Sequence, residues 1–383
     1  MEELFDDIIK ENTSGARVFL ADIVSKSTSP AILADRMGEL ENLVNTYGGV
    51  VILKTYQKQD SANYETYIGK GKFEEIMHDM EQEGANLLII GNVLKPSQIY
   101  KINEKLAPIK AKAWDRVDLI LKIFDKHAQW TEAKLQIKLA AIRHMGPRIY
   151  GMGMELSRQW GGGSGASRGQ GETNTEVMKR HLKDKVLKIE KELKEFERMR
   201  MLHRENRKRQ GMPTVGIVWY TNAGKSSLLN SMTDKWVLAE NKLFATLWTS
   251  VGKLFIMKDP VMGTGKEVLL NDTIWFIRDL PPKLIKAFSS TLEDSIESEL
   301  LLHVVDASDP FIEDRIAVVN HILDDIWAKQ ERVMVYNKID KVSPERLAEL
   351  QETYGTDNCV WISTYTKEWL GDVKKLLAEK VVK

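Results

Sequence analysis

The chain has 383 residues, a length that accommodates two or three domains with cores of their own. Its hydrophobic content of 43% is typical of a globular protein and excludes a disordered or fibrous chain. Lysine plus arginine equals aspartate plus glutamate at 55 each, so the net charge gives no indication of a nucleic-acid partner. The acidic segment 1–10 has no signal-peptide core and no stretch is long enough to cross a bilayer, so we expect a cytosolic protein.

Apolar runs alternate with amphipathic stretches from about residue 18 to residue 114. The clearest predicted strands and helices follow one another at 50–53, 73–83, 87–90 and 97–106. This alternation is typical of a small α/β unit with parallel strands, and we place this N-terminal domain at 1–124.

Two helical patterns follow, from 125 to about 144 and from 175 to 209. In both patterns apolar residues recur at intervals of three and four: Leu135, Leu139, Ile142, Met178, Leu182, Val186, Ile189, Leu193 and Phe196. Two long helices with such stripes should pack against each other as a hairpin, which we place at 125–212.

A glycine-rich loop at 146–171 is expected to join these helices, because it has too few apolar side chains to build a core. It is either a flexible linker or a tip that orders on a phosphate-rich surface. In the second interpretation the backbone would approach the phosphates closely at Gly161, Gly162 and Gly163. Arg158 and Arg168 would neutralise the phosphate charge. A basic run at 198–209 adds positive charge, although a solvated helix end has the same pattern.

Gly211-Met212-Pro213 breaks the second helix and opens a last domain at 213–383. Five apolar strands alternate there with helical segments, at 215–218, 268–270, 301–305, 332–336 and 360–362. The pattern predicts a doubly wound α/β sheet.

The loop after the first of these strands reads as a phosphate-binding loop that lacks its first glycine. Its residues are Trp219, Tyr220, Thr221, Asn222, Ala223, Gly224, Lys225 and Ser226, with Ser227 in the helix that follows. The backbone N–H groups would cradle phosphates, Lys225 would supply positive charge, and the Ser226 hydroxyl would bind Mg²⁺.

Two more motifs lie at the carboxyl ends of predicted strands. Asp272 fits the acidic residue that holds Mg²⁺, usually through water. Asn337-Lys338-Ile339-Asp340 follows a later strand, and the Asp340 carboxylate can accept both N–H groups that guanine, unlike adenine, offers together. Ser363 and Thr364 would support the base. In this order the motifs predict a GTPase with GTP as substrate and GDP as product.

Segments along nearly the whole chain resemble the HflX-type GTPases of the Obg-HflX superfamily. The matching segments are 67–72, 132–136, 161–172, 243–247, 276–281 and 287–293. The resemblance implies a ribosome-associated GTPase that separates stalled or idle subunits, with the 50S subunit and its rRNA as partners, and we expect a monomer. A scaffold that binds ribosomes without hydrolysing GTP and a ribosome-assembly GTPase remain open as alternatives.

The switch residues determine how fast this site should hydrolyse GTP. Phe276 occupies the position where many GTPases carry a water-orienting glutamine, so intrinsic hydrolysis should be slow and should be stimulated by ribosomes. Either Thr249 or Ser250 should be the switch ligand of Mg²⁺, and no catalytic residue is assigned.

Tryptophan stands where glycine is expected at Trp219, Trp275 and Trp160, and by local context also at Trp248, Trp327 and Trp369. An indole in the phosphate loop or at the switch should block γ-phosphate binding, because the backbone must approach the oxygens there. A single cause explains all of these positions: we hypothesise that the source reads the codon UGA as glycine, whereas the printed sequence renders it as tryptophan. Trp114 and Trp361 are expected to be genuine core residues.

Overall fold

The computed structural model describes residues 15–128, 130–160, 174–233, 251–259, 264–272, 276–279, 284–285 and 297–382. The chain divides into two compact units, Met1–Glu195 and Phe196–Lys383. Within the part of the chain that the structure describes, no helix has both the length and the apolar composition needed to span a bilayer.

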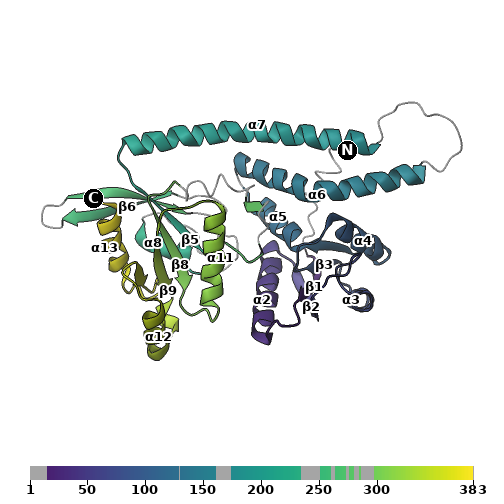
Figure 1. The fold of residues 1–383 in the computed structure, drawn as a ribbon, viewed down its shortest axis with the longest axis horizontal. Helices are drawn as coiled ribbons and strands as arrows, with labels where there is room; N and C mark the ends of the chain where they lie inside the picture. Colours follow the sequence, from purple (N-terminus) through teal and green to yellow (C-terminus); the bar gives the residue numbers. More distant parts are fainter. Residues whose placement is uncertain are drawn as a thin grey trace. The chain divides into compact units, whose positions relative to one another are not determined.

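The first unit contains a four-stranded parallel sheet with the strand order β2-β1-β3-β4 (Figure 1). Its elements are β1 (Arg17–Val24), α2 (Pro30–Tyr47), β2 (Val50–Lys58), α3 (Lys70–Glu83), β3 (Leu87–Ile90), α4 (Pro96–Leu106), η1 (Ala107–Ile109), β4 (Lys112–Asp115) and α5 (Arg116–His127). Helices connect the strands because parallel neighbours need a crossover longer than a hairpin turn. The parallel α/β unit expected from the sequence is therefore confirmed.

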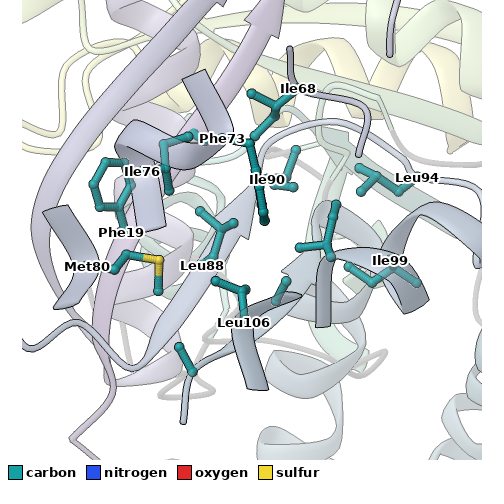
Figure 2. Packing of buried hydrophobic residues seen from close by; sticks show 14 of the residues in the cluster. Phe19, Ile68, Phe73, Ile76, Met80, Leu88, Ile90, Leu94, Ile99 and Leu106 are labelled. Carbon is teal, nitrogen blue, oxygen red and sulfur yellow. The ribbon is translucent and has the colours of Figure 1, made fainter. Parts of the chain in front are cut away.

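Helices cover this sheet on both faces. Alternate residues of the central strands, including Phe19 and Leu88, pack against α3 and α4 in one apolar cluster (Figure 2). The intervening Leu20 and Ile89 point to the opposite face and are also fully buried. Burial on both faces explains why these strands read as continuous apolar runs.

Helices α6 (Thr131–Trp160) and α7 (Asn174–Arg209) pack along an apolar seam. The seam consists of Leu135, Leu139, Ile142, Leu182, Val186, Ile189 and Leu193. Arg143 and Glu190 form an ion pair between the two helices at 2.7 Å. The hairpin predicted from the apolar stripes is confirmed.

Two of the helix ends expected from the sequence are wrong, although the domain bounds themselves stay a prediction. The helical pattern near residue 125 belongs to α5, which ends at His127, and α6 begins at Thr131. Helix α6 also continues through Trp160, so residues 146–160 of the expected glycine-rich loop are helical. Glycines scattered among methionine, leucine, glutamate and arginine cost about 1 kcal/mol each in helix propensity and do not end a helix by themselves.

A buried ion network joins the start of α5 to α6. Asp115 caps α5 by accepting the Asp118 N–H at 2.8 Å. Arg148 of α6 donates to Asp118 Oδ2 at 2.6 Å and to Asp115 Oδ2 at 3.2 Å, and His144 Nε2 lies 3.2 Å from Asp115 Oδ1. Two carboxylates buried together need such cations, because a buried charge without its partner costs about 3–5 kcal/mol. The network therefore fixes α6 on the N-terminal sheet.

The second unit contains a six-stranded sheet with the order β10-β9-β8-β5-β7-β6. Its elements are β5 (Thr214–Trp219), α8 (Lys225–Met232), β6 (Val251–Asp259), β7 (Thr264–Asp272), β8 (Leu300–Asp306), α11 (Ile312–Asp325), β9 (Glu331–Asn337), η2 (Ile339–Lys341), α12 (Pro344–Tyr354), β10 (Cys359–Trp361) and α13 (Leu370–Val381). All neighbours except β6 and β7 pair in parallel. The doubly wound sheet and its five expected strands are confirmed.

Strand β6 escaped the sequence analysis. It pairs with β7 in antiparallel register and therefore makes the sheet mixed. Leu254 and Ile256 are buried, whereas Lys253, Phe255 and Met257 are exposed. Such alternation is typical of an antiparallel strand with one face on the core, so the signal was present in the sequence.

Two tryptophans adopt the left-handed backbone conformation that favours glycine. Trp327 has φ +60° and Trp369 has φ +59°. Their side chains are 75% and 62% exposed, so little burial compensates for the strain. Both positions are among those that the sequence assigned to glycine, and their backbone supports that assignment.

The surroundings of Trp327 are those of a glycine that ends a helix. The Trp327 N–H donates to Asp324 O at 3.0 Å, and the next N–H, of residue 328, donates to Leu323 O at 3.0 Å. Gly48 has the same pair of bonds after α2 and the same sign of φ. This Schellman motif usually has glycine at the position of Trp327, because a Cβ is strained there.

Acid should destabilise the second unit through His303. This residue of β8 is fully buried, and burial, with a contribution from the charge of Arg332, lowers its pKa to about 3. In the unfolded chain this histidine takes up a proton below pH 6.5, whereas in the folded protein it stays neutral down to about pH 3. The free energy of unfolding is therefore highest above pH 6.5 and falls as the pH is lowered toward 3. Between pH 6.5 and 4, His303→Leu should gain about 1.4 kcal/mol per pH unit over the parent in urea unfolding. Parallel profiles for the two proteins would contradict this.

Replacing Trp327 by glycine should stabilise the protein. We expect Trp327→Gly to raise the free energy of unfolding by about 1 kcal/mol, because relief of left-handed strain exceeds the entropy that glycine adds to the unfolded chain. Trp130 is a matched control, since it is 66% exposed and lies outside the positive-φ residues. Trp130→Gly should give no gain, and an equal gain from both changes would refute the strain argument.

Mass spectrometry of the native protein tests the codon hypothesis directly. Glycine is expected at positions 219, 275, 327 and 369, and tryptophan is expected at position 114. Tryptic peptides that retain tryptophan at 219 and 275 would exclude the hypothesis.

Candidate functional site

The loops expected to bind nucleotide meet at one edge of the second sheet. Strands β5, β8, β9 and β10 are successive neighbours, and β7 flanks β5 on the other side. The strand register pairs Ile217 with Asp272 and Asp306 with Asn337. Because these five strands are parallel, their carboxyl ends share the edge at which open α/β sheets bind ligands.

The phosphate loop runs from the end of β5 into α8. Gly224 has φ +90°, and a Cβ at this position would lie 2.3 Å from Asn337 Nδ2. Only glycine fits here, since both the backbone conformation and the close approach exclude a side chain. Lys225 is buried, and Ser226 and Ser227 are half-buried in the first turn of α8, where the helix dipole favours anions.

Side chains of the guanine motif bind the backbone of the phosphate loop. Asn337 Nδ2 donates to Ala223 O at 2.9 Å, and Lys338 Nζ donates to Asn222 O at 2.6 Å. Asn337 is fully buried, so its bond to Ala223 is shielded from water. The two bonds hold the loop that would contact phosphates at a set distance from the loop that would contact the base.

The Asp340 carboxylate is oriented by the loop after β10. Ser363 Oγ donates to Asp340 Oδ1 at 2.5 Å and accepts the Thr366 N–H at 3.1 Å. The Thr364 N–H donates to Asn337 Oδ1 at 3.1 Å. Thr364 thus contributes its backbone N–H, and this contact does not depend on its side chain.

The segment that begins at Phe276 is bonded to the phosphate loop. The Phe276 N–H donates to Trp219 O at 3.0 Å, and Phe276 O accepts the Thr221 N–H at 3.2 Å. Two residues after Phe276, the Arg278 N–H donates to the side-chain hydroxyl of Tyr220 at 3.1 Å. The Phe276 ring is 1% exposed, so it is a core side chain that cannot orient a water molecule.

The indole of Trp219 occupies space beside the phosphate-binding lysine. Lys225 Nζ lies 4.2 Å from the centroid of the Trp219 ring, within the range of a cation–π contact. Trp219 is 4% exposed. The ammonium expected to reach phosphate oxygens therefore lies against an aromatic face.

Several predicted site residues lie outside the described residues or lack described side chains. Those outside are Gly161, Gly162, Gly163, Arg168, Thr249, Ser250 and Trp275. For Arg158 and Trp160 in α6, and for Asp272 at the end of β7, only the backbone is described.

Two residues near the site escaped the sequence analysis. Asp306 ends β8, and its Oδ2 lies 2.7 Å from Lys338 Nζ. Arg315 of α11 places its guanidinium 4.4 Å from the centroid of the Tyr220 ring. An acidic residue directly after an apolar strand was an available signal for Asp306. Arg315 had no such signal, since its contact depends on how α11 packs.

Asp115, Asp118 and His144 form a separate group whose ligand atoms lie within 4.8 Å of one another, as metal ligands would. Arg148 already binds both carboxylates. Burial opposes protonation of His144, but the hydrogen bonds and charges of Asp115 and Asp118 outweigh it and raise its pKa to about 9. Because Arg148 pairs with both carboxylates and His144 lies beside them, we interpret the group as an ion network.

Three family models match successive parts of the chain. Residues 34–125 match a GTP-binding GTPase N-terminal model, residues 127–207 match a GTP-binding GTPase middle-region model, and residues 214–338 match a 50S ribosome-binding GTPase model.

Similar proteins carry one name and cover most of the chain. GTPase HflX of Caldanaerobacter subterraneus subsp. tengcongensis is 42% identical over 89% of this chain and 74% of its own length. GTPase HflX of Flavobacterium psychrophilum is 36% identical over 97% and 92%, and that of Escherichia coli K12 is 34% identical over 90% and 78%. Among solved structures, a complex of SsGBP with GDP aligns with a TM-score of 0.50 at 25% identity, over 96% of this chain and 97% of that one. The chain belongs to the HflX family of GTPases.

Proposed function

We propose that this protein hydrolyses GTP with Mg²⁺ and acts in the cytoplasm on the large ribosomal subunit, where it separates stalled or idle subunits. The bonds from Asn337 and Lys338 to the phosphate loop support nucleotide binding, and they are the observation that carries the proposal. The oriented carboxylate of Asp340 supports a choice of guanine. The description of the model matched by residues 214–338 supports the 50S subunit and its rRNA as partners. We take the acting form to be a monomer.

The nucleotide site is proposed to consist of the phosphate loop, the carboxyl end of β7 and the two base-binding loops. Its residues are Tyr220, Thr221, Asn222, Ala223, Gly224, Lys225, Ser226, Ser227, Asp272, Asn337, Lys338, Asp340, Ser363 and Thr364. The proposed domains are 1–124, 125–212 and 213–383, and ribosome contacts are assigned to Arg158, Arg168 and the glycines at 161–163.

The residues present fit a magnesium ion beside a bound phosphate. Gly224 has φ +90° where the loop enters α8, and the Ser226 hydroxyl follows it in the first turn of that helix. Hydroxyl and carboxylate oxygens are the donors that Mg²⁺ prefers, and Ser226, Asp272 and either Thr249 or Ser250 would hold it. The ion would neutralise charge on the phosphate oxygens.

Hydrolysis by the isolated protein should be slow. Phe276 lacks a hydrogen-bonding side chain and is buried, so no residue at this position can orient the attacking water. Rate enhancement then requires a group or an ordering event supplied from outside. Contact with the ribosome, which would order the switch segments, is the proposed source.

A second candidate function is a scaffold that binds ribosomes without hydrolysing GTP. The position of Trp219 favours it, because the indole takes up the Lys225 ammonium that should contact phosphate. If tryptophan is genuine at this position, nucleotide binding should be weak even though the base-binding loops are intact. Nucleotide titration therefore separates the two candidates.

Ribosomes should stimulate GTP turnover by this protein. We expect turnover to rise by at least about tenfold with 50S subunits, because an ordered switch lowers the barrier by about 1.4 kcal/mol or more. The measurement is phosphate release with and without 50S and 30S subunits, accompanied by co-sedimentation with 50S, 30S and 70S particles in GTP and in GDP. Equal turnover with and without 50S subunits would contradict the proposal.

The proposed ribosome contact can be tested with paired variants. Arg158→Ala/Arg168→Ala should lower the stimulated turnover and leave the basal turnover unchanged, because the arginines are expected to bind phosphate groups of rRNA. Lys374→Ala/Lys375→Ala removes the same charge from α13 and should change neither value.

Guanine specificity should appear in calorimetry on the full chain with Trp219→Gly and Trp275→Gly. We expect GDP to bind at least about a hundredfold more tightly than ADP, because adenine leaves the Asp340 carboxylate without its two donors. Asp340→Asn should reduce this preference and favour a xanthine nucleotide, whose carbonyl oxygen can accept from the new amide. Equal affinity for GDP and ADP would sink the proposed function, and tight GDP binding by the chain that keeps tryptophan at 219 and 275 would count against the scaffold.

A further inference from the structure

Asp306 lies beside the guanine motif although it belongs to a different strand. It is the last residue of β8, and the register of β8 with β9 pairs it with Asn337. The Ala307 N–H donates to Asn337 O at 2.8 Å and extends this pairing past the end of the strand. Asp306 and Lys338 are therefore brought together by the sheet itself.

Both carboxylate oxygens of Asp306 have defined partners. Oδ1 accepts the Ser308 N–H at 2.9 Å and the Ser308 hydroxyl at 2.6 Å. Oδ2 accepts from Lys338 Nζ at 2.7 Å. Because Ser308 holds one oxygen through two bonds, the second oxygen is directed at the lysine.

Lys338 connects this carboxylate to the phosphate loop. Its ammonium donates to Asn222 O at 2.6 Å as well as to Asp306. The side chains of Lys338 and Asp306 are 17% and 20% exposed, so the pair is partly shielded from water. A flexible lysine would otherwise sample many rotamers, and a charged partner at hydrogen-bond distance selects one of them.

We propose that Asp306 is a positioning residue for guanine-nucleotide binding. It holds the Lys338 ammonium against the phosphate loop, so that the base-binding loop and the phosphate-binding loop are spaced correctly before nucleotide arrives. Asp306 does not touch the nucleotide in this role. It acts through Lys338, and its removal acts on affinity through the entropy of ordering that side chain.

A purely local role for Asp306 can be separated from this one. The turn at Ser308 uses Oδ1, whereas the lysine uses Oδ2. Asp306→Asn keeps an oxygen that can accept from Ser308, but it removes the negative charge and places a donor where Lys338 needs an acceptor. The variant therefore preserves the turn and breaks the connection to Lys338.

The test is a double-mutant cycle on GDP affinity, with Asp306→Asn, Lys338→Met and the double variant. It is run by fluorescence titration on the full chain and in parallel on the full chain carrying Trp219→Gly and Trp275→Gly. Asp306→Asn should weaken GDP binding by about tenfold, the size expected for a hydrogen bond to a charged group. The double variant should bind no more weakly than Lys338→Met alone, because Asp306 acts only through the lysine.

Two controls make the result specific. Asp325→Asn removes the same charge at the end of α11 and should leave GDP affinity unchanged. The nucleotide-free melting temperature of Asp306→Asn should match that of the parent. Additive losses in the cycle, unchanged GDP affinity in Asp306→Asn, or a lowered melting temperature that accounts for the loss would each overturn the proposal.

Discussion

The nucleotide site depends on hydrogen bonds that join the guanine motif to the backbone of the phosphate loop. Asn337 and Lys338 donate to the carbonyls of Ala223 and Asn222, and Gly224 gives Asn337 the room to do so. The donors are the last residue of β9 and the residue that follows it, the acceptors lie in the loop after β5, and β8 lies between the two strands. Parallel pairing places all three carboxyl ends at one edge, so the sheet fixes the spacing within which a base and its phosphates must fit.

The same edge carries the features that limit the chemistry. Phe276 pairs with the start of the phosphate loop through backbone bonds, and its buried ring has no group that could orient a water molecule. Trp219 lies beside Lys225 at the other end of the loop. A bulky ring beside Lys225 is consistent with a codon for glycine that has been read as tryptophan, and the left-handed backbone at Trp327 and Trp369 gives the same indication.

The first unit is held together by a buried sheet and a buried ion network. Its sheet is buried on both faces, and its connection to α6 relies on charges, because Asp115 and Asp118 are buried against Arg148 and His144. A buried ion network is selective in geometry, since each carboxylate must find its own cation. The network thus sets the position of α6, the helix that precedes the glycine-rich sequence at 161–171.

The sequence alone determined the family, the doubly wound sheet and the guanine motif, because these depend on local patterns: apolar runs, helical stripes, and a short motif directly after a strand. It also indicated glycine at Trp327, where local context sufficed. The tertiary structure alone decided that Asp306 reaches Lys338, that Arg315 packs on Tyr220, and that α6 remains helical through Trp160. Strand β6 lies between these cases, since its alternation was visible but its antiparallel partner was not. The physical reason is that the contacts of Asp306 and Arg315 join residues far apart in the chain, and only strand register and helix packing bring these residues together.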